Sequence, residues 1–254
     1  MTYRCWVLLC VLCLCLYGCG DEGLESLYDP AVQAAPPVAV TGVPSELQEQ
    51  LWGNREAYIE KLTWALQHGE DFRPVAEDYL ERICQLDHQR AFYQKYIDAG
   101  GVAILASISV ADETLQMARN IVFQMTAKHP EIREYLTLEH KHYQIIINGY
   151  YENIRGIPEF TDHHIREFPI PHCGAAFGNA YCVSQIWHLP EQKRDRIQSP
   201  VMQTFVHEFA HAIHLFAISE LDPGFNARLK QAYETAVASG TWKDLYAETN
   251  YREY

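Results

Sequence analysis

Cations are scarce in this sequence, and cysteines are scarce outside its first 19 residues. The 254 residues include 20 Lys and Arg against 33 Asp and Glu, which gives a formal net charge of -13. Because few cations are available to displace the counterions of a phosphate backbone, we expect no nucleic-acid partner. Five of the eight cysteines lie within residues 1–19, so the three that remain are too few for a disulfide framework.

The N-terminus also lacks an apolar run long enough to cross a bilayer as a helix. Its uncharged apolar stretch, residues 5–17, is shorter than the ~20 residues that such a helix needs. Arg4 precedes the stretch and Gly18 follows it, which is the layout of a cleaved secretory signal. We therefore predict a signal peptide over residues 1–19, with an uncleaved anchor as the alternative.

Residues 16–19, Leu-Tyr-Gly-Cys, resemble the lipobox of bacterial lipoproteins. An acylated Cys19 would tether the mature protein to a membrane surface without spanning the membrane. Cleavage without acylation would secrete the protein, so both forms of export stay open. Residues 20–44 are rich in Asp, Glu, Pro and Ala, which predicts a flexible tether before a folded part that begins at Ser45.

The remaining residues, 45–254, have the composition of a globular domain. With 48% hydrophobic and 21% charged residues, the chain can bury a sizeable core. Ser45 and Gln48 fit a capping box, and the apolar periodicity that follows favours a mainly helical α+β fold with a small sheet. The expected helices span residues 45–68, 74–97 and 112–128, and the expected strands span residues 102–110 and 143–147.

Cys173 and Cys182 flank a segment rich in Gly, Ala and Asn. In an exported protein these two thiols could form a disulfide that closes the loop between them. Spacing alone does not establish the geometry of a disulfide, so two free thiols are the alternative.

The strongest chemical signal is the sequence His207-Glu208-Phe209-Ala210-His211. It lies in an apolar stretch of helical character, in which residues four apart share one face. Two imidazoles placed in this way can hold one Zn²⁺, with Glu208 beside the activated water as general base. Core histidines without a metal are the alternative. The neighbouring apolar residues are expected to surround the histidines and keep the site dry: Phe205, Phe209, Ala212, Ile213 and Phe216.

A zinc site of this kind needs a third protein ligand and one position left open for water. The residue ten positions after His207 is Ala217, so a third histidine on the metzincin spacing is absent. His214 shares the face of the other two histidines, but three ligands on one straight helix converge poorly. We expect His214 to have a supporting or packing role and the third ligand to come from elsewhere.

Residues 242–254 offer that ligand on a second predicted helix. At about 100° per residue, Tyr246, Asn250 and Glu253 fall on one face, whereas Glu248 points away. The helix would present a carboxylate together with a phenol that can reach a developing oxyanion. An amphipathic surface helix is the alternative.

The stretch HEFAHAIH, together with LDPGFNARLKQAYETAVASGTWKDLYAETNYREY, resembles the Glu-ligand zincins (gluzincins) related to the catalytic domain of anthrax lethal factor. It especially resembles uncharacterised exported bacterial proteins with HEFAHAIH and YAxTNxxEY blocks, closely over residues 195–254 and loosely back to residue 90. The resemblance implies a zincin-like catalytic domain with an HExxH helix and the zinc ligands His207, His211 and Glu253. It also implies two catalytic residues, Glu208 and Tyr246.

Members of that family continue past the Glu-Tyr pair with further helix, whereas this chain stops at Tyr254 without a Gly or Pro stop signal. We expect the sequence to be a fragment that is truncated at its C-terminus. The alternative is that Glu253 lies on a frayed terminus and binds zinc poorly.

The leading hypothesis is an exported zinc metallopeptidase, secreted or anchored at the cell surface, that acts on a peptide or protein substrate. A surface-tethered zinc-binding protein without peptidase activity is the second, and hydrolysis of a non-peptide amide or ester is the third. The sequence does not predict the cleavage specificity or the oligomeric state.

Overall fold

The computed structural model describes residues 36–137, 143–147, 157–158, 174–175, 181–184, 200–241, 243 and 250–251. Most of these residues are helical, and five strands form one small sheet. The predicted α+β class with mainly helical content is therefore confirmed. No helix in this part of the chain combines the length and the apolarity needed to cross a membrane. The predicted signal peptide, residues 1–19, lies outside the described residues.

The sheet is mixed and runs in the order β1-β2-β3-β5-β4. The central pairs are parallel and the two edge pairs are antiparallel. The strands are β1 (Lys95–Ala99), β2 (Val102–Ala106), β3 (Gln144–Ile147), β4 (Gly174–Ala175) and β5 (Tyr181–Ser184).

Both strands expected from the sequence are present, but β2 ends at Ala106 instead of residue 110. The cause is local hydrogen bonding by two serines that follow it. The Ser109 N–H donates to the Ser107 hydroxyl at 3.2 Å, and the two hydroxyl oxygens lie 2.9 Å apart. Side-chain bonds of this kind compete with the backbone ladder and end a strand.

Three helices pack close to the sheet. Two of them, α6 (Asp112–Met125) and α7 (Glu131–Leu136), lie in the connection from β2 to β3, and α9 (Pro200–Ile213) follows β5 along the chain. The helix predicted over residues 112–128 is therefore present but shorter. It ends where the Thr126 hydroxyl donates to the Val122 carbonyl at 2.6 Å.

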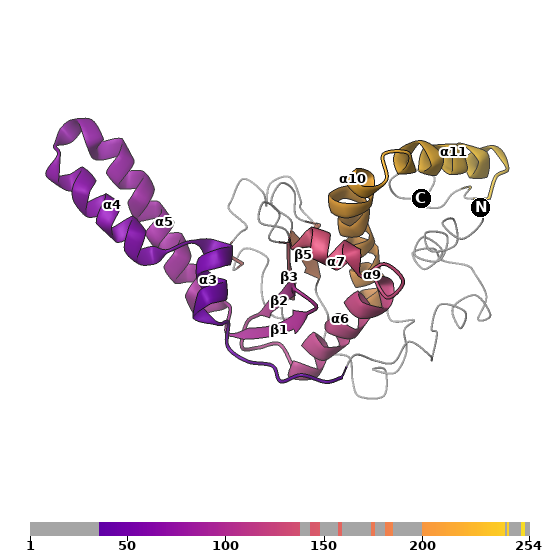
Figure 1. Cartoon of the computed structure of the whole chain (residues 1–254), viewed down its shortest axis with the longest axis horizontal. Coiled ribbons are helices and arrows are strands. Elements are labelled where there is room, and N and C mark those ends of the chain that lie inside the picture. The colour runs from indigo at the N-terminus through magenta and orange to yellow at the C-terminus, as the bar shows by residue number, and fades with distance from the viewer. Residues whose placement is uncertain are drawn as a thin grey trace.

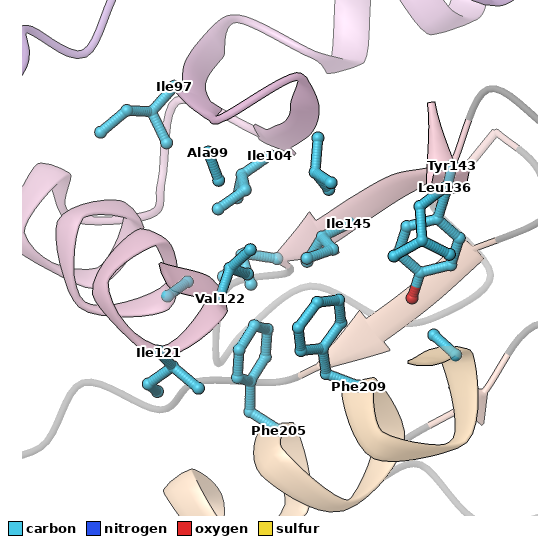
Figure 2. Close-up of a cluster of buried hydrophobic side chains, with 14 of the residues drawn as sticks. Ile97, Ala99, Ile104, Ile121, Val122, Leu136, Tyr143, Ile145, Phe205 and Phe209 are labelled. Carbon is cyan, nitrogen blue, oxygen red and sulfur yellow. The ribbon is translucent and has the colours of Figure 1, made fainter. Parts of the chain in front are cut away.

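Both faces of the sheet are buried at its strands β2 and β3. On one face Ile104 and Ile145 join the side chains of α6 and α9 in the larger core, which Figure 2 shows. On the other face Leu105 and Ile146 belong to a second, smaller core. A sheet covered on both sides needs apolar residues at every position, which explains why β2 and β3 lack polar alternation.

A helical hairpin extends from the sheet in Figure 1. Its helices are α4 and α5, which pack along one another and are joined by the short η1, with α3 at their base. The bounds are α3 (Ser45–Trp52), α4 (Arg55–Gln67), η1 (Glu70–Phe72) and α5 (Arg73–Phe92).

The prediction of a single helix over residues 45–68 is wrong, because two helices, α3 and α4, lie there. It breaks at Gly53, whose φ of 104° is a conformation that glycine adopts without strain. Asn54 restarts the helix because its side chain accepts a backbone N–H of the first turn of α4 at 2.9 Å. Ser45 is the first residue of α3 and not its N-cap. Gln48 does not close a capping box, since its amide donates to the Val43 carbonyl at 2.8 Å.

The strand β1 replaces the last turn of the second predicted helix, which ends at Phe92 and not at residue 97. A tight turn at Gly100 and Gly101 joins β1 to β2, and the Asp98 carboxylate accepts their N–H groups at 3.0 and 2.9 Å. Ile97 is buried in the larger core. Ile97 continues the apolar spacing of α5, which is why the sequence predicted helix there. Its burial in the larger core as part of β1 outweighs that local preference.

Residues 36–44, which fall within the predicted tether, contact the domain at several points. Thr41 and Tyr96 of β1 exchange two backbone hydrogen bonds, of 3.0 and 2.7 Å. Arg119 of α6 is 6% exposed and donates to the carbonyl of Pro36 at 3.1 Å and to that of Asp98 at 2.8 Å. These contacts begin at Pro36, before the predicted start of the folded part at Ser45.

The cysteine predictions fall mostly outside the described residues. Cys19 and Cys173 both lie there. Cys182 lies in β5, opposite Ile145 of β3 and Ala175 of β4. A disulfide between Cys173 and Cys182 therefore stays a prediction. Cys84 of α5 is a free, exposed thiol.

Replacing Arg119 tests how firmly residues 36–44 are held. We expect Arg119→Met to lower the free energy of unfolding by about 3 kcal/mol, because two carbonyls lose a charged donor. Urea denaturation measures this change. The control is Arg73→Met, which removes exposed ion pairs with Glu70 and Glu77 and should change stability by less than about 0.5 kcal/mol. Equal effects of the two variants would contradict the role given to Arg119.

Candidate metal centre

The motif His207-Glu208-Phe209-Ala210-His211 lies within α9, as predicted. The structure describes the helical backbone at residues 207 and 208 and both backbone and side chain at His211. Since α9 is α-helical from residue 200 to residue 213, positions 207 and 211 stand one turn apart on one face. This is the spacing at which two imidazoles can share a metal ion.

The opposite face of α9 holds the helix on the sheet. Phe205 and Phe209 are fully buried, and their ring centroids lie 6.3 Å apart. Both rings point from α9 toward the strands in Figure 2. The helix packs on β5, β4 and α6. At about 100° per residue, positions 207 and 211 lie about 150° around the helix from the two phenylalanines.

The role predicted for the apolar neighbours is therefore wrong in one respect. Phe205, Phe209 and Ala212 do not surround the histidine positions, because they face the core on the far side of the helix. They fix the direction of the histidine face instead. His211 itself is half-buried, which leaves an imidazole partly accessible to an incoming ion.

The helical stretch is not uniform after His211. A π-helical turn, η4 (His214–Ile218), follows α9 directly, and α10 (Ser219–Leu221) follows η4. Single π-helical turns inside longer helices often occur at functional sites. The α-helix predicted to continue through this stretch thus changes its winding three residues past His211.

His214 packs and hydrogen bonds, in agreement with the supporting role expected of it. It is 7% exposed and stacks edge-on against Phe225 with 5.2 Å between ring centroids. Its Nε2 lies 2.7 Å from Oδ1 of Asn226, whose Nδ2 donates to the Ser219 hydroxyl at 3.1 Å. Because Asn226 uses its amide nitrogen as a donor there, Oδ1 is the acceptor and His214 Nε2 carries the hydrogen.

Sequence reasoning did not find Asn226 and Ser219 as partners of His214. Asn226 follows His214 by twelve residues, across η4, α10 and a turn. No periodicity or motif marks this contact, because it depends on how the chain reverses between α10 and the next helix, α11 (Phe225–Ala238).

The helix α10, which follows η4, is tied to α7. The Tyr135 phenol donates a hydrogen bond to the carboxylate of Glu220 in α10, and this bond is the main cause that raises the pKa of the phenol. The bond links the segment that follows the candidate ligands to a helix on the sheet.

Glu253, the predicted third ligand, lies outside the described residues, as does Tyr246. The described residues near it, Asn250 and Tyr251, are not helical. The prediction of a continuous helix over residues 242–254 is therefore wrong at these two positions. The face shared by Tyr246, Asn250 and Glu253 stays a prediction, because Tyr246 and Glu253 lie outside the described residues.

The donor set present fits zinc in its chemistry, since two imidazoles at this spacing on a rigid helix are zinc ligands of the ordinary kind. In the part of the chain whose side chains the structure describes, no three His, Cys, Asp or Glu residues form a metal-binding cluster. The side chains of His207, Glu208 and Glu253 are not in that part. Neither a family model nor a curated protein nor a solved structure matches this chain.

Shortening Phe209 tests how α9 is anchored. We expect Phe209→Ala to lower the free energy of unfolding by about 3–5 kcal/mol, because it leaves a cavity in the larger core. Thermal and urea denaturation measure this loss. Leu215→Ala, in the exposed part of η4, is the control and should cost less than about 0.5 kcal/mol. A Phe209 variant as stable as the control would mean that α9 is held by other contacts.

Proposed function

We propose that this chain is an exported zinc metallopeptidase with a zincin-like catalytic domain. The observation that carries the proposal is the position of HExxH on α9. The far side of this helix is fixed by buried aromatic rings, and positions 207 and 211 are presented together on the other side. The resemblance of residues 195–254 to gluzincins supports the same conclusion.

In this proposal His207 and His211 hold the zinc ion, with Glu253 as third ligand. When bound, zinc supplies a Lewis acid that activates water near neutral pH and polarises a carbonyl group. Glu208 takes the proton of the attacking water and passes it to the leaving amine. Tyr246 donates a hydrogen bond to the oxyanion that develops on the substrate carbonyl.

The sheet supports a peptide as the substrate. In the part of the chain that the structure describes, β4 is the edge strand beyond β5, and α9 packs on both. An edge strand offers backbone groups that can pair with an extended peptide. A peptide added along β4 would run close to the helix that carries His207 and His211.

A zinc-binding protein without peptidase activity, tethered at the surface through Cys19, is the second candidate. The observation that favours it is the non-helical backbone at Asn250 and Tyr251, since a less rigid support for Glu253 would hold the metal without aligning it for catalysis. Zinc bound in the purified protein, with no cleavage of a peptide library with or without chelator, would favour this candidate.

Replacing the general base separates catalysis from metal binding. We expect Glu208→Gln to lower kcat by at least about 10²–10⁴-fold, because the amide cannot accept the proton of water. Zinc content should stay unchanged, since Glu208 is not a ligand. Peptide hydrolysis and elemental analysis measure the two effects. The control is Glu234→Gln on the exposed face of α11; retained turnover in the Glu208 variant would remove this residue from the mechanism.

Removing one imidazole tests the ligand assignment directly. We expect His211→Ala to lose its bound zinc on dialysis, because two remaining ligands hold the ion weakly. His129→Ala is the matched control, since His129 is partly exposed and its Nδ1 lies 2.8 Å from the carboxylate of Glu131. Elemental analysis after dialysis distinguishes the two variants. Equal zinc content in both would place the metal, if any, at another site.

A further inference from the structure

The helical hairpin of α4 and α5 exposes large apolar side chains. Ile59, Leu66 and Leu80 are 37%, 68% and 52% exposed. In the described part of the chain α4 packs mainly along α5, and Figure 1 shows the hairpin standing away from the sheet. Large apolar side chains that gather on an exposed surface mark a contact with a partner.

These side chains fall in one arc on each helix. At about 100° per residue, Ile59, Leu62 and Leu66 lie within about 60° of one another around α4. On the same measure Leu80 and Cys84 lie within about 40° of one another around α5. We call these five residues the apolar face of the hairpin.

An ion pair indicates that the two arcs lie on the same side of the hairpin. Arg55 falls within the arc on α4, and Asp87 lies about 20° beyond Leu80 on α5. The Arg55 guanidinium donates two hydrogen bonds to the Asp87 carboxylate, at 2.6 and 2.8 Å, and so bridges the two helices. Because this paired geometry requires both residues on one side, the apolar side chains next to them share that side.

The opposite side of the hairpin has different contents. Lys61 lies there, with its ammonium over the rings of Tyr58 and Tyr79 at 5.6 and 5.9 Å from their centroids. Trp64 also lies there and stacks on His68, with 4.0 Å between ring centroids. A cation and stacked rings occupy that side, so the apolar face is the side better suited to an apolar partner.

Acidic residues border the apolar face. Glu56 and Glu60 lie along the outer edge of α4 and Glu81 along that of α5, and all three are exposed. Residues 55–92 as a whole contain five Lys and Arg against eight Asp and Glu. The face is therefore apolar at its centre and negative at its borders. The cations on this side are held in ion pairs: Arg55 with Asp87, and Arg73 with Glu70 and Glu77.

This charge pattern distinguishes between two occupants of the face. In a second copy of this chain the same acids would meet one another, and the net charge of -13 would add to the repulsion. A basic partner would instead bring cations next to these acids. A helix suits the face best, because a third helix can lay an apolar stripe between two packed helices.

We propose that the apolar face of the α4–α5 hairpin binds a basic amphipathic helix of another protein. The apolar stripe of that helix packs on the apolar face, and its Lys and Arg side chains pair with Glu56, Glu60 and Glu81. The contact does not involve the candidate metal centre, so this inference is independent of the proposed function.

The test uses a synthetic helical peptide of about 18 residues, which is longer than α4 at about 20 Å. The peptide carries Leu on one face and Lys on the other. We expect the full chain to bind it with a micromolar Kd, measured by fluorescence anisotropy. A peptide with Glu in place of every Lys should not bind. Raising the salt concentration from about 50 to about 300 mM should weaken binding at least about fivefold.

Cys84 reports whether the peptide lies on the apolar face. Its thiol is free and exposed. With about 90% of the protein bound, alkylation of this thiol by iodoacetamide should be about tenfold slower. Mass spectrometry of the proteolytic fragment that contains Cys84 measures the rate. This measurement uses the unchanged protein, so it does not depend on the folding of a variant.

Matched variants test the two parts of the face. We expect Leu80→Gln to weaken peptide binding by about tenfold, whereas Val75→Gln, at a 40% exposed position on the opposite side of the same helix, should change it by less than about twofold. Combining Glu56→Gln with Glu81→Gln should weaken binding and flatten its salt dependence. Glu113→Gln, at an exposed position of α6, should do neither. Thermal unfolding shows which variants are folded.

Several results would overturn the inference. These are equal losses from Leu80→Gln and Val75→Gln, unchanged alkylation of Cys84 in the presence of bound peptide, or equal binding of the Lys and Glu peptides. A dimer detected by light scattering, with Cys84 protected in the absence of peptide, would assign the face to a second copy of this chain. All of these results leave the HExxH helix and its zinc untouched, so the proposed function is tested separately.

Discussion

The burial of Phe205 and Phe209 against the sheet is the interaction on which the candidate site depends. Both rings are fully buried, so turning α9 by half a turn would expose two aromatic side chains at a cost of about 1.5–3 kcal/mol each. It would also place the histidine positions in an apolar core without partners. The direction of the histidine face is therefore decided by the hydrophobic effect before any metal binds.

The sheet on which α9 packs has the N-terminal segment at one edge and β4 at the other. Arg119, which bonds to Pro36, and the pairing of Thr41 with Tyr96 hold this segment beside the β1 edge. The strand β4 lies at the other edge, four strand spacings or about 19 Å away. In the described part of the chain, the N-terminal segment and β4 thus lie at opposite edges of the sheet.

Several elements were predictable because their signals are local. The spacing of His207 and His211 within an apolar stretch predicts α9, and the uninterrupted apolar residues 102–106 predict a strand. Other elements were missed for reasons that lie elsewhere in the chain. Ile97 belongs to a strand because β2 is available to pair with it. Residues 36–44 contact the domain because β1 and Arg119 of α6, which follow much later in the chain, bond to Thr41 and Pro36.

By itself the sequence determined the α+β class and the chemistry of the candidate ligands, since both follow from residue types repeated at short intervals. Tertiary structure alone decided that the phenylalanines of α9 anchor the helix instead of lining the histidines, and that His214 bonds to Asn226. The physical reason is that periodicity places residues on a face, whereas the surface that this face meets is supplied by distant parts of the chain.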